Sequence, residues 1–190
     1  MITQPVEFLK QNKLVIQRAI ILCLEDPETI NSMVGILDKI VNFTKIDLNF
    51  ETEERIPPLQ LAVRNRSKKA AEVLLGGNCD VNFRNSKDQS TALHIAALQS
   101  NKNMVVFLLE NGANTRIENC KRMVPNGITT NIKIIKILSD HDYKMEQELL
   151  KKKVAKRMRE SQQNIDELNQ YNSQMINLKT APNANHAPVQ

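Results

Sequence analysis

The chain has 190 residues and no Trp, so one modest core must be built mainly from Leu, Ile, Val and Ala. With 25% charged residues its formal net charge is +5, which is too small to indicate a dedicated nucleic-acid-binding protein. Its three cysteines have neither the density of a disulfide scaffold nor the CxxC spacing of a zinc site, which predicts a reducing compartment, cytoplasmic or nuclear. The longest apolar run, Ala19–Leu24, is too short to span a bilayer, and Met1–Glu7 lacks the features of a secretory signal.

Residues 1–50 predict a pair of amphipathic helices. Apolar side chains recur three and four apart over residues 5–25 and again over residues 30–41. Between them, Asp26 is a candidate N-cap and Pro27 suits the first position of the second helix. The sequence Ile46-Asp47-Leu48-Asn49 then recurs as Cys79-Asp80-Val81-Asn82. We therefore expect residues 1–50 to be a degenerate first copy of a repeat that caps the N-terminal end.

Residues 51–122 contain two clearer copies of the same pattern, which end in Leu74-Leu75 and in Leu108-Leu109. The better copy consists of Thr91-Ala92-Leu93-His94-Ile95-Ala96-Ala97, Met104-Val105-Val106-Phe107-Leu108-Leu109 and Asn111-Gly112-Ala113-Asn114. The earlier copy consists of Pro57-Pro58-Leu59-Gln60-Leu61-Ala62-Val63, Ala71-Glu72-Val73-Leu74-Leu75 and Asn78-Cys79-Asp80-Val81-Asn82. A period in the low thirties that opens with a T-P-L-H-x-A-like stretch resembles the ankyrin repeat.

This resemblance implies an all-α fold: a short ankyrin-repeat solenoid of stacked helix-turn-helix pairs with hairpin loops, followed by a long C-terminal helix. It also implies that Thr91 and His94 tie their turn together by hydrogen bonds. Gly112, and Asn78 in the earlier copy, occupy the place after the outer helix where a left-handed residue is required. The earlier copy departs from the family at Gln60, which replaces the His, and at Val63-Arg64-Asn65, which replaces the Ala-Ala pair.

After residue 122 the pattern shortens and the composition then changes. Residues 123–141 lack an inner helix of normal length, which predicts a truncated C-terminal repeat. Residues 142–178 are rich in Lys, Glu, Gln and Asn without Gly or Pro, which predicts one long, basic, polar helix. Residues 179–190 are rich in Pro and Asn, and we expect them to form a disordered tail.

Two features of the long helix leave its role open. Lys144–Glu160 carries seven Lys or Arg against three Glu, which indicates a nuclear-import signal, an RNA or anionic-lipid patch, or simply a solvated helix face. No aromatic residues alternate with these basic ones, which weakens the nucleic-acid interpretation. The apolar residues keep helical spacing and predict either self-association as a coiled coil or packing over the shortened last repeat; they are Leu150, Val154, Met158, Ile165, Leu168 and Met175.

The sequence contains no recognisable catalytic or metal-binding constellation. His94 has no nucleophile beside it, and its place in the T-x-x-H turn gives it a structural role. His141, His186 and the scattered cysteines form no metal site. The Gly76-Gly77 pair lacks the remainder of a phosphate-binding loop. We therefore expect no enzymatic activity, no cofactor and no metal.

The family resemblance predicts which residues meet a partner, because partners of ankyrin repeats contact the hairpin tips and the exposed positions of the inner helices. The predicted partner-binding residues are Glu53, Glu54, Ile56, Arg64, Asn65, Arg84, Lys87, Asp88, Ser90, Leu98, Gln99, Lys121 and Arg122. The expected function is that of an adaptor or inhibitor that binds another protein. One alternative is an inhibitor of Rel-type transcription factors, and another is nucleic-acid or anionic-surface association through the basic helix.

Overall fold

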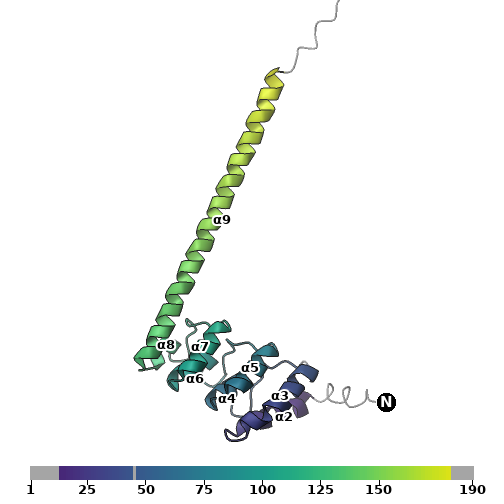
Figure 1. Cartoon of the computed structure of the whole chain (residues 1–190), viewed down its shortest axis with the longest axis vertical. Helices are drawn as coiled ribbons and strands as arrows, with labels where there is room; N and C mark the ends of the chain where they lie inside the picture. Colours follow the sequence, from purple (N-terminus) through teal and green to yellow (C-terminus); the bar gives the residue numbers. More distant parts are fainter. Residues whose placement is uncertain (1–12, 45, 181–190) are drawn as a thin grey trace, which may run out of the picture. The chain divides into compact units, whose positions relative to one another are not determined.

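The computed structural model describes residues 13–44 and 46–180, with side chains up to Ile176. The predicted start of the first helix at residues 5–12, and the predicted tail beyond residue 180, lie outside the described residues. Within these limits the chain forms α-helices and loops, with no strand. The helices are α2 (Lys13–Glu25), α3 (Ile30–Thr44), α4 (Pro58–Arg64), α5 (Lys68–Gly76), α6 (Ala92–Leu98), α7 (Lys102–Glu110), α8 (Pro125–Ile128) and α9 (Ile132–Thr180) (Figure 1).

Two of the outer helices begin after short polar side chains that cap them, and α4 and α8 begin at prolines, which have no N–H to satisfy. Ser67 Oγ accepts a hydrogen bond from Ala70 N at 3.3 Å before α5, and Asn101 Oδ1 accepts one from Met104 N at 3.2 Å before α7. Asp26 accepts from Glu28 N at 3.0 Å, but this bond holds a turn, and α3 begins only at Ile30. Asp26 therefore caps a turn and not the helix itself, and the predicted helix start at Pro27 is wrong.

The ends of the two outer helices have the predicted left-handed backbone. Asn78 follows α5 with a φ of 64°, and Gly112 follows α7 with a φ of 84°. In both places the chain turns back sharply, so that the amide of the next residue, Cys79 or Ala113, bonds to a carbonyl in the last turn of the helix at 3.2 or 2.9 Å.

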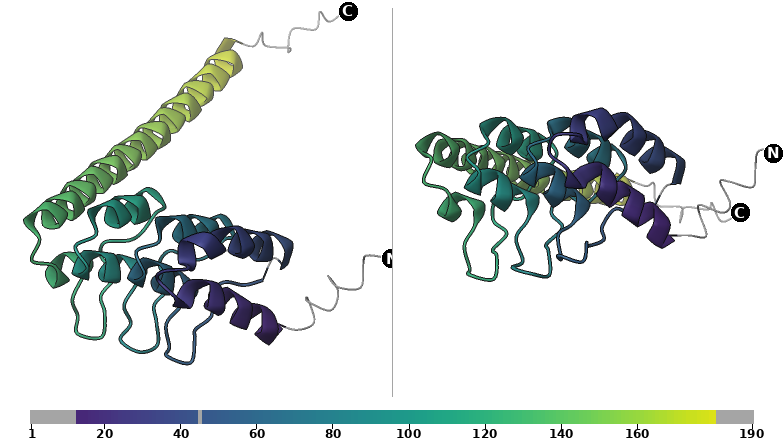
Figure 2. Two further views of the ribbon diagram at one scale, coloured as in Figure 1. Left: turned by 60° about the horizontal axis from the view of Figure 1, so that its bottom comes forward. Right: turned by 90° about the horizontal axis from the view of Figure 1, so that it is seen from below.

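The helices up to Asp142 stack in two rows. The inner row contains α2, α4, α6 and α8, each of which contacts the next. The outer row contains α3, α5, α7 and the first turns of α9. Three loops project from the side of the inner row (Figure 2); we call them finger 1 (residues 49–57), finger 2 (82–90) and finger 3 (115–123). This arrangement confirms the predicted all-α solenoid of helix pairs and hairpin loops.

One apolar core runs through the stack from Ile16 to Leu138. Alanines are fully buried between the helices and let their backbones approach closely; they are Ala62, Ala70, Ala71, Ala92, Ala96 and Ala97. Asparagine side chains connect the successive repeats. Asn49 Oδ1 accepts from Asp80 N, and Asn82 Oδ1 accepts from Asn114 N, both at 2.8 Å.

The C-terminal part contains the shortened inner helix that the sequence predicts, since α8 has only four residues. α9 then runs without a break from Ile132 to Thr180, so the long helix predicted over residues 142–178 begins ten residues earlier, within the truncated repeat. No Gly or Pro lies between Gly127 and Pro182, and nothing local interrupts the helix. By contacts the chain nevertheless divides into two compact units, Met1–Asp142 and Tyr143–Gln190, which we call the repeat unit and the C-terminal extension.

Candidate protein-binding surface

Two buried polar side chains fix the fingers to the inner helices. His94 in α6 is buried; its Nδ1 accepts from Thr91 N at 3.1 Å and lies 2.8 Å from Thr91 Oγ1. Because Nδ1 accepts this bond, the ring proton sits on Nε2, which donates to Met123 O in finger 3 at 3.1 Å. The predicted hydrogen bonds between Thr91 and His94 are thus confirmed, and His94 also holds the next finger.

Gln60 connects its inner helix to the following finger in the same way one repeat earlier, with a side-chain amide in place of the imidazole. Its Nε2 donates to Ser90 O at 2.7 Å and to Phe83 O at 3.2 Å, both in finger 2. Its Oε1 accepts from Asn85 Nδ2 at 2.8 Å. The departure from the family at this position therefore preserves the connection between an inner helix and the following finger.

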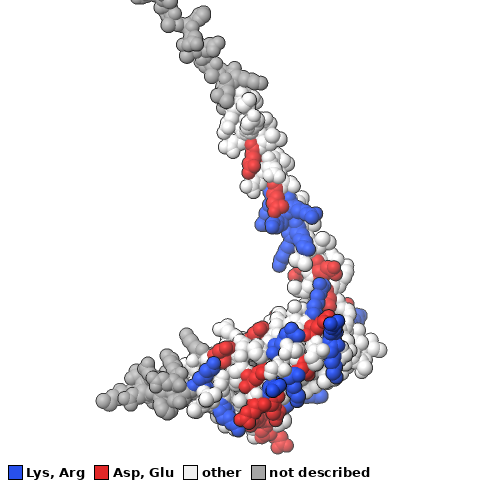
Figure 3. All heavy atoms as spheres, turned by 180° about the vertical axis from the view of Figure 1, so that it is seen from behind, with Lys and Arg blue, Asp and Glu red and all other residues white. Residues whose placement is uncertain are grey.

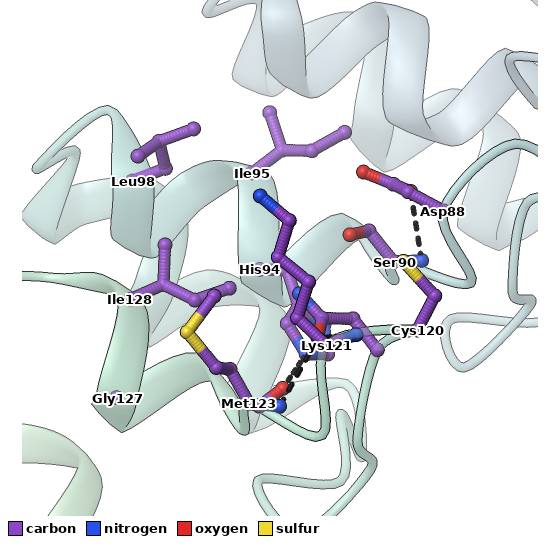
Figure 4. Close-up of a pocket in the computed structure, with 11 residues that line it drawn as sticks. Asp88, Ser90, His94, Ile95, Leu98, Cys120, Lys121, Met123, Gly127 and Ile128 are labelled. Carbon is purple, nitrogen blue, oxygen red and sulfur yellow. Dashed lines mark hydrogen bonds between the residues drawn. The ribbon is translucent and has the colours of Figure 1, made fainter.

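A groove of about 390 Å³ lies where α6, finger 2, finger 3 and α8 meet. We call it the C-terminal groove. Ile95, Leu98, Met123 and Ile128 supply its apolar side, while Asp88, Ser90 and Cys120 border the other side and Lys121 lies between them (Figure 4). Leu98 is 66% exposed, so a large apolar side chain faces solvent in a concave place.

The polar side of this groove is held in a defined charge state. Partial burial raises the pKa of Asp88, but hydrogen bonds from Ser90 and Asn85 and the proximity of His94 outweigh it and hold that pKa below its usual value. Burial lowers the pKa of His94, against the hydrogen bond to Met123 O and the charge of Asp88. At neutral pH the groove therefore presents an anionic Asp88 and a neutral His94.

A second groove, of about 190 Å³, lies between α2, finger 1 and α4. We call it the N-terminal groove. It is equivalent to the first by repeat position, since Leu61 corresponds to Ile95 and Arg64 to Leu98. Arg64 Nη1 lies 3.5 Å from Glu54 Oε2, and Arg18 Nη1 lies 4.0 Å from Glu53 Oε1. Charged pairs thus occupy the place that an apolar side chain has in the C-terminal groove.

The structure distributes the predicted partner-binding residues over several places. Glu53, Glu54, Ile56 and Arg64 line the N-terminal groove. Asp88, Ser90, Leu98 and Lys121 line the C-terminal groove. Lys87 and Arg122 are exposed on fingers 2 and 3.

Four of the predicted partner-binding residues also make hydrogen bonds within the stack. Asn65 Nδ2 donates to Leu24 O at 2.6 Å, and Gln99 Nε2 donates to Arg64 O at 2.7 Å, so each satisfies the C-terminal carbonyl of the neighbouring inner helix. Arg84 is exposed but donates to Glu118 O at 3.0 Å, from finger 2 to finger 3. Ser90 is buried; its backbone amide donates to Asp88 Oδ1 and its carbonyl accepts from Gln60 Nε2.

The sequence reasoning missed several lining residues, namely Arg18, Ile21 and Glu25 in the N-terminal groove and Ile95, Met123 and Ile128 in the C-terminal groove. A signal for Ile128 existed, because it follows Ile95 at the repeat period. No comparable signal marked Arg18, since the degenerate first copy has lost the repeat pattern.

Other kinds of site have little support in the described part of the chain. No group of three or more His, Cys, Asp or Glu side chains gathers there as metal ligands would. None of the described helices is both long and apolar enough to cross a membrane. Cys23 and Cys79 are buried thiols, and burial with the nearby Asp80 and Asp47 raises the pKa of Cys79 to about 12.

The C-terminal extension carries a separate charged feature. Lys151, Lys152, Lys153, Lys156, Arg157 and Arg159 are all exposed; we call them the basic cluster. Figure 3 shows these basic side chains gathered on one part of the long helix, whereas both signs of charge are mixed over the repeat unit. Lys156 forms an ion pair with Glu160 at 3.8 Å.

Comparison with known proteins places this surface in a family context. A model of three ankyrin repeats matches residues 23–119. A stretch of 72 residues is 36% identical to the ankyrin repeat and KH domain-containing protein mask-1 of Caenorhabditis elegans. This stretch is 38% of this chain and 3% of that protein. A stretch of 82 residues is 35% identical to the fowlpox virus (strain NVSL) protein named "Putative ankyrin repeat protein FPV031", which is 42% of this chain and 24% of that protein. The matches thus cover a small part of either relative.

Proposed function

The chain belongs to the ankyrin repeat family, and we propose on that premise that it is a non-catalytic adaptor or inhibitor that holds another protein along its inner helices and fingers. Ankyrin repeats in general are protein-interaction modules, and stacked repeats present an extended surface to their partners. The partner would lie across the C-terminal groove and insert an apolar side chain there. We also propose that the chain self-associates through the C-terminal extension.

One observation carries the proposal for the groove. Leu98 is 66% exposed and stands over a concave surface with Ile95, Met123 and Ile128. An exposed leucine by itself is ordinary, but an apolar cluster in a concavity with Asp88 and Lys121 at its border is the kind of exposed apolar patch that marks an interaction site. In the N-terminal groove the equivalent Arg64 is paired with Glu54, so that groove has less apolar surface to offer.

The experiment compares full-length variants with a partner first identified by affinity capture and then purified. Leu98→Asp should weaken binding roughly 30-fold, as expected for a hot-spot loss of about 2 kcal/mol. The matched control is Ile132→Asp, because Ile132 is 80% exposed at the start of α9 in the outer row. That control should bind as tightly as the unchanged chain, and both variants should show the same helical circular dichroism.

A third variant, Lys151→Gln/Lys152→Gln/Lys153→Gln, separates this proposal from its alternative. The six exposed cations of the basic cluster favour nucleic-acid or anionic-surface association as the second candidate function. Binding through phosphates falls steeply as the salt concentration rises. If the lysine changes abolish partner binding and Leu98→Asp leaves it intact, the groove proposal is wrong and the basic cluster is the functional element.

A further inference from the structure

The C-terminal extension presents an apolar stripe to solvent. Over its described length the exposed large apolar side chains include Leu150, Val154, Met158, Ile165, Leu168 and Met175, with exposed fractions from 39% at Met175 to 68% at Met158. Helices in proteins gain most of their stability from packing an apolar face. A helix of this length with an uncovered stripe therefore calls for an occupant of that stripe.

From Met158 onward the stripe keeps the seven-residue period of a coiled coil. With Met158 at position a, Ile165 and Asn172 follow at a, while Ser161, Leu168 and Met175 fall at d. The charged residues between 158 and 176 all fall at the outer positions b and c; they are Arg159, Glu160, Asp166 and Glu167. The flanking e and g positions from Gln162 to Tyr171 are uncharged. This seam carries no charge that a neighbouring helix would have to desolvate.

The polar residues within the seam point to the identity of the neighbour. An apolar groove of another protein would leave the Asn172 amide without a hydrogen-bond partner, which is costly when buried. A second copy in the same direction and register places Asn172 against Asn172 and Ser161 against Ser161, so that each finds a partner. An antiparallel pair that set Arg159 beside Glu167 of the other copy would put Asn172 against Val154 instead.

We propose that two copies of this chain associate through residues 158–176 as a parallel, in-register, two-stranded coiled coil. Ile165 at a with Leu168 at d favours two strands, and a single Asn at an a position fixes register and oligomeric state. The seam is short, so the association is concentration-dependent. Its consequence, which rests on the proposed function, is that one dimer carries two repeat units and binds a partner with repeated sites more tightly than one chain does.

Salt distinguishes this pairing from the antiparallel one. In a parallel pair the two basic clusters, residues 151–159 of each copy, lie beside one another and repel. Salt screens that repulsion over about 8 Å at physiological ionic strength, so the dimer fraction should increase with salt. An antiparallel pair would instead bring each basic cluster toward Asp166 and Glu167 of the other copy, and salt would weaken that attraction.

Sedimentation equilibrium of the full-length chain tests the proposal, with twice the mass of one chain expected as concentration rises. Leu168→Asp should return the chain to one copy, because it buries a carboxylate in the seam. Gln163→Asp, the same charge at the outer f position, should leave the dimer intact. The Leu98→Asp variant should also keep the dimer mass, so failure of the groove proposal and failure of this one are separable.

A disulfide cross-link tests direction and register. Met175→Cys at position d, made together with Cys120→Ser because Cys120 is an exposed thiol, keeps Asn172 in place and should cross-link under mild oxidation. Gln170→Cys in the same background should not, since position f faces away from the seam. A monomer at all concentrations, a trimer, a dimer without the cross-link at residue 175, or a dimer that salt dissociates would each overturn the proposal.

Discussion

Removal of the Gln60 side chain should destabilise the repeat unit by an amount that its hydrogen bonds predict. Gln60 is 1% exposed and is bonded to Ser90 O, Phe83 O and Asn85 Nδ2. In Gln60→Ala, Ser90 O keeps its bond from Asn85 N at 3.1 Å. Phe83 O and Asn85 Nδ2 lose their hydrogen bonds to the Gln60 side-chain amide. At about 1–3 kcal/mol for each unsatisfied group, the free energy of unfolding should decrease by about 3 kcal/mol.

Restoring the family's residue at this position should also destabilise the fold. His94 works because Thr91 N donates to its Nδ1. Pro57 stands where Thr91 does in the later repeat, and a proline has neither an N–H nor a hydroxyl to offer. Gln60→His would therefore leave its Nδ1 without a donor and Asn85 Nδ2 without an acceptor. The double change Pro57→Thr/Gln60→His should recover part of the loss.

Urea denaturation followed by circular dichroism measures these differences at constant m-value. The thermal midpoint of Gln60→Ala should fall by about 6–12 °C, at about 2–4 °C for each kcal/mol in a chain of this size. A loss below about 0.5 kcal/mol, the usual range for an exposed substitution, would refute the role assigned to Gln60. So would a Gln60→His variant as stable as the unchanged chain.

Two further predictions concern stability. Gly77→Ala should lower the free energy of unfolding by about 1–3 kcal/mol through overpacking, because the added methyl group would fall against Val41 Cγ1 and within 2.8 Å of Leu48 Cδ1. The control Gly76→Ala meets nothing within 4 Å and should be neutral or stabilising in urea melts. Equal effects of the two substitutions would contradict this packing argument. Because burial holds the pKa of His94 below the value of about 6.5 in an unfolded chain, the unfolded state takes up the proton first, and stability should decrease as the pH falls below about 6.5. His94→Gln should lose this part of the pH dependence, and an unchanged slope in urea midpoints between about pH 7.5 and about pH 5.5 would exclude His94 as its source.

The sequence by itself determined the features that depend on neighbouring residues. The period of the copies, the shortened α8 and the left-handed Asn78 and Gly112 follow from local patterns, in which a few residues satisfy their own backbone. The bonds between Thr91 and His94 were implied by the resemblance to the ankyrin repeat. The local rules failed in detail at Asp26, whose side chain caps a turn ahead of α3. Near residue 142 the change of composition coincides with the boundary between the two compact units but not with a helix end, since α9 is one continuous helix.

Only the tertiary structure decided which polar side chains connect the repeats and which line a groove. Asn65 and Gln99 occupy variable positions of the repeat, yet both bond to carbonyls of the preceding inner helix. The C-terminal groove combines Leu98 with Ile128 and Lys121 from a later repeat. Residues so far apart in the chain meet only because helix pairs stack in register. The sequence pattern within one repeat does not specify which side chains of the next repeat will face it.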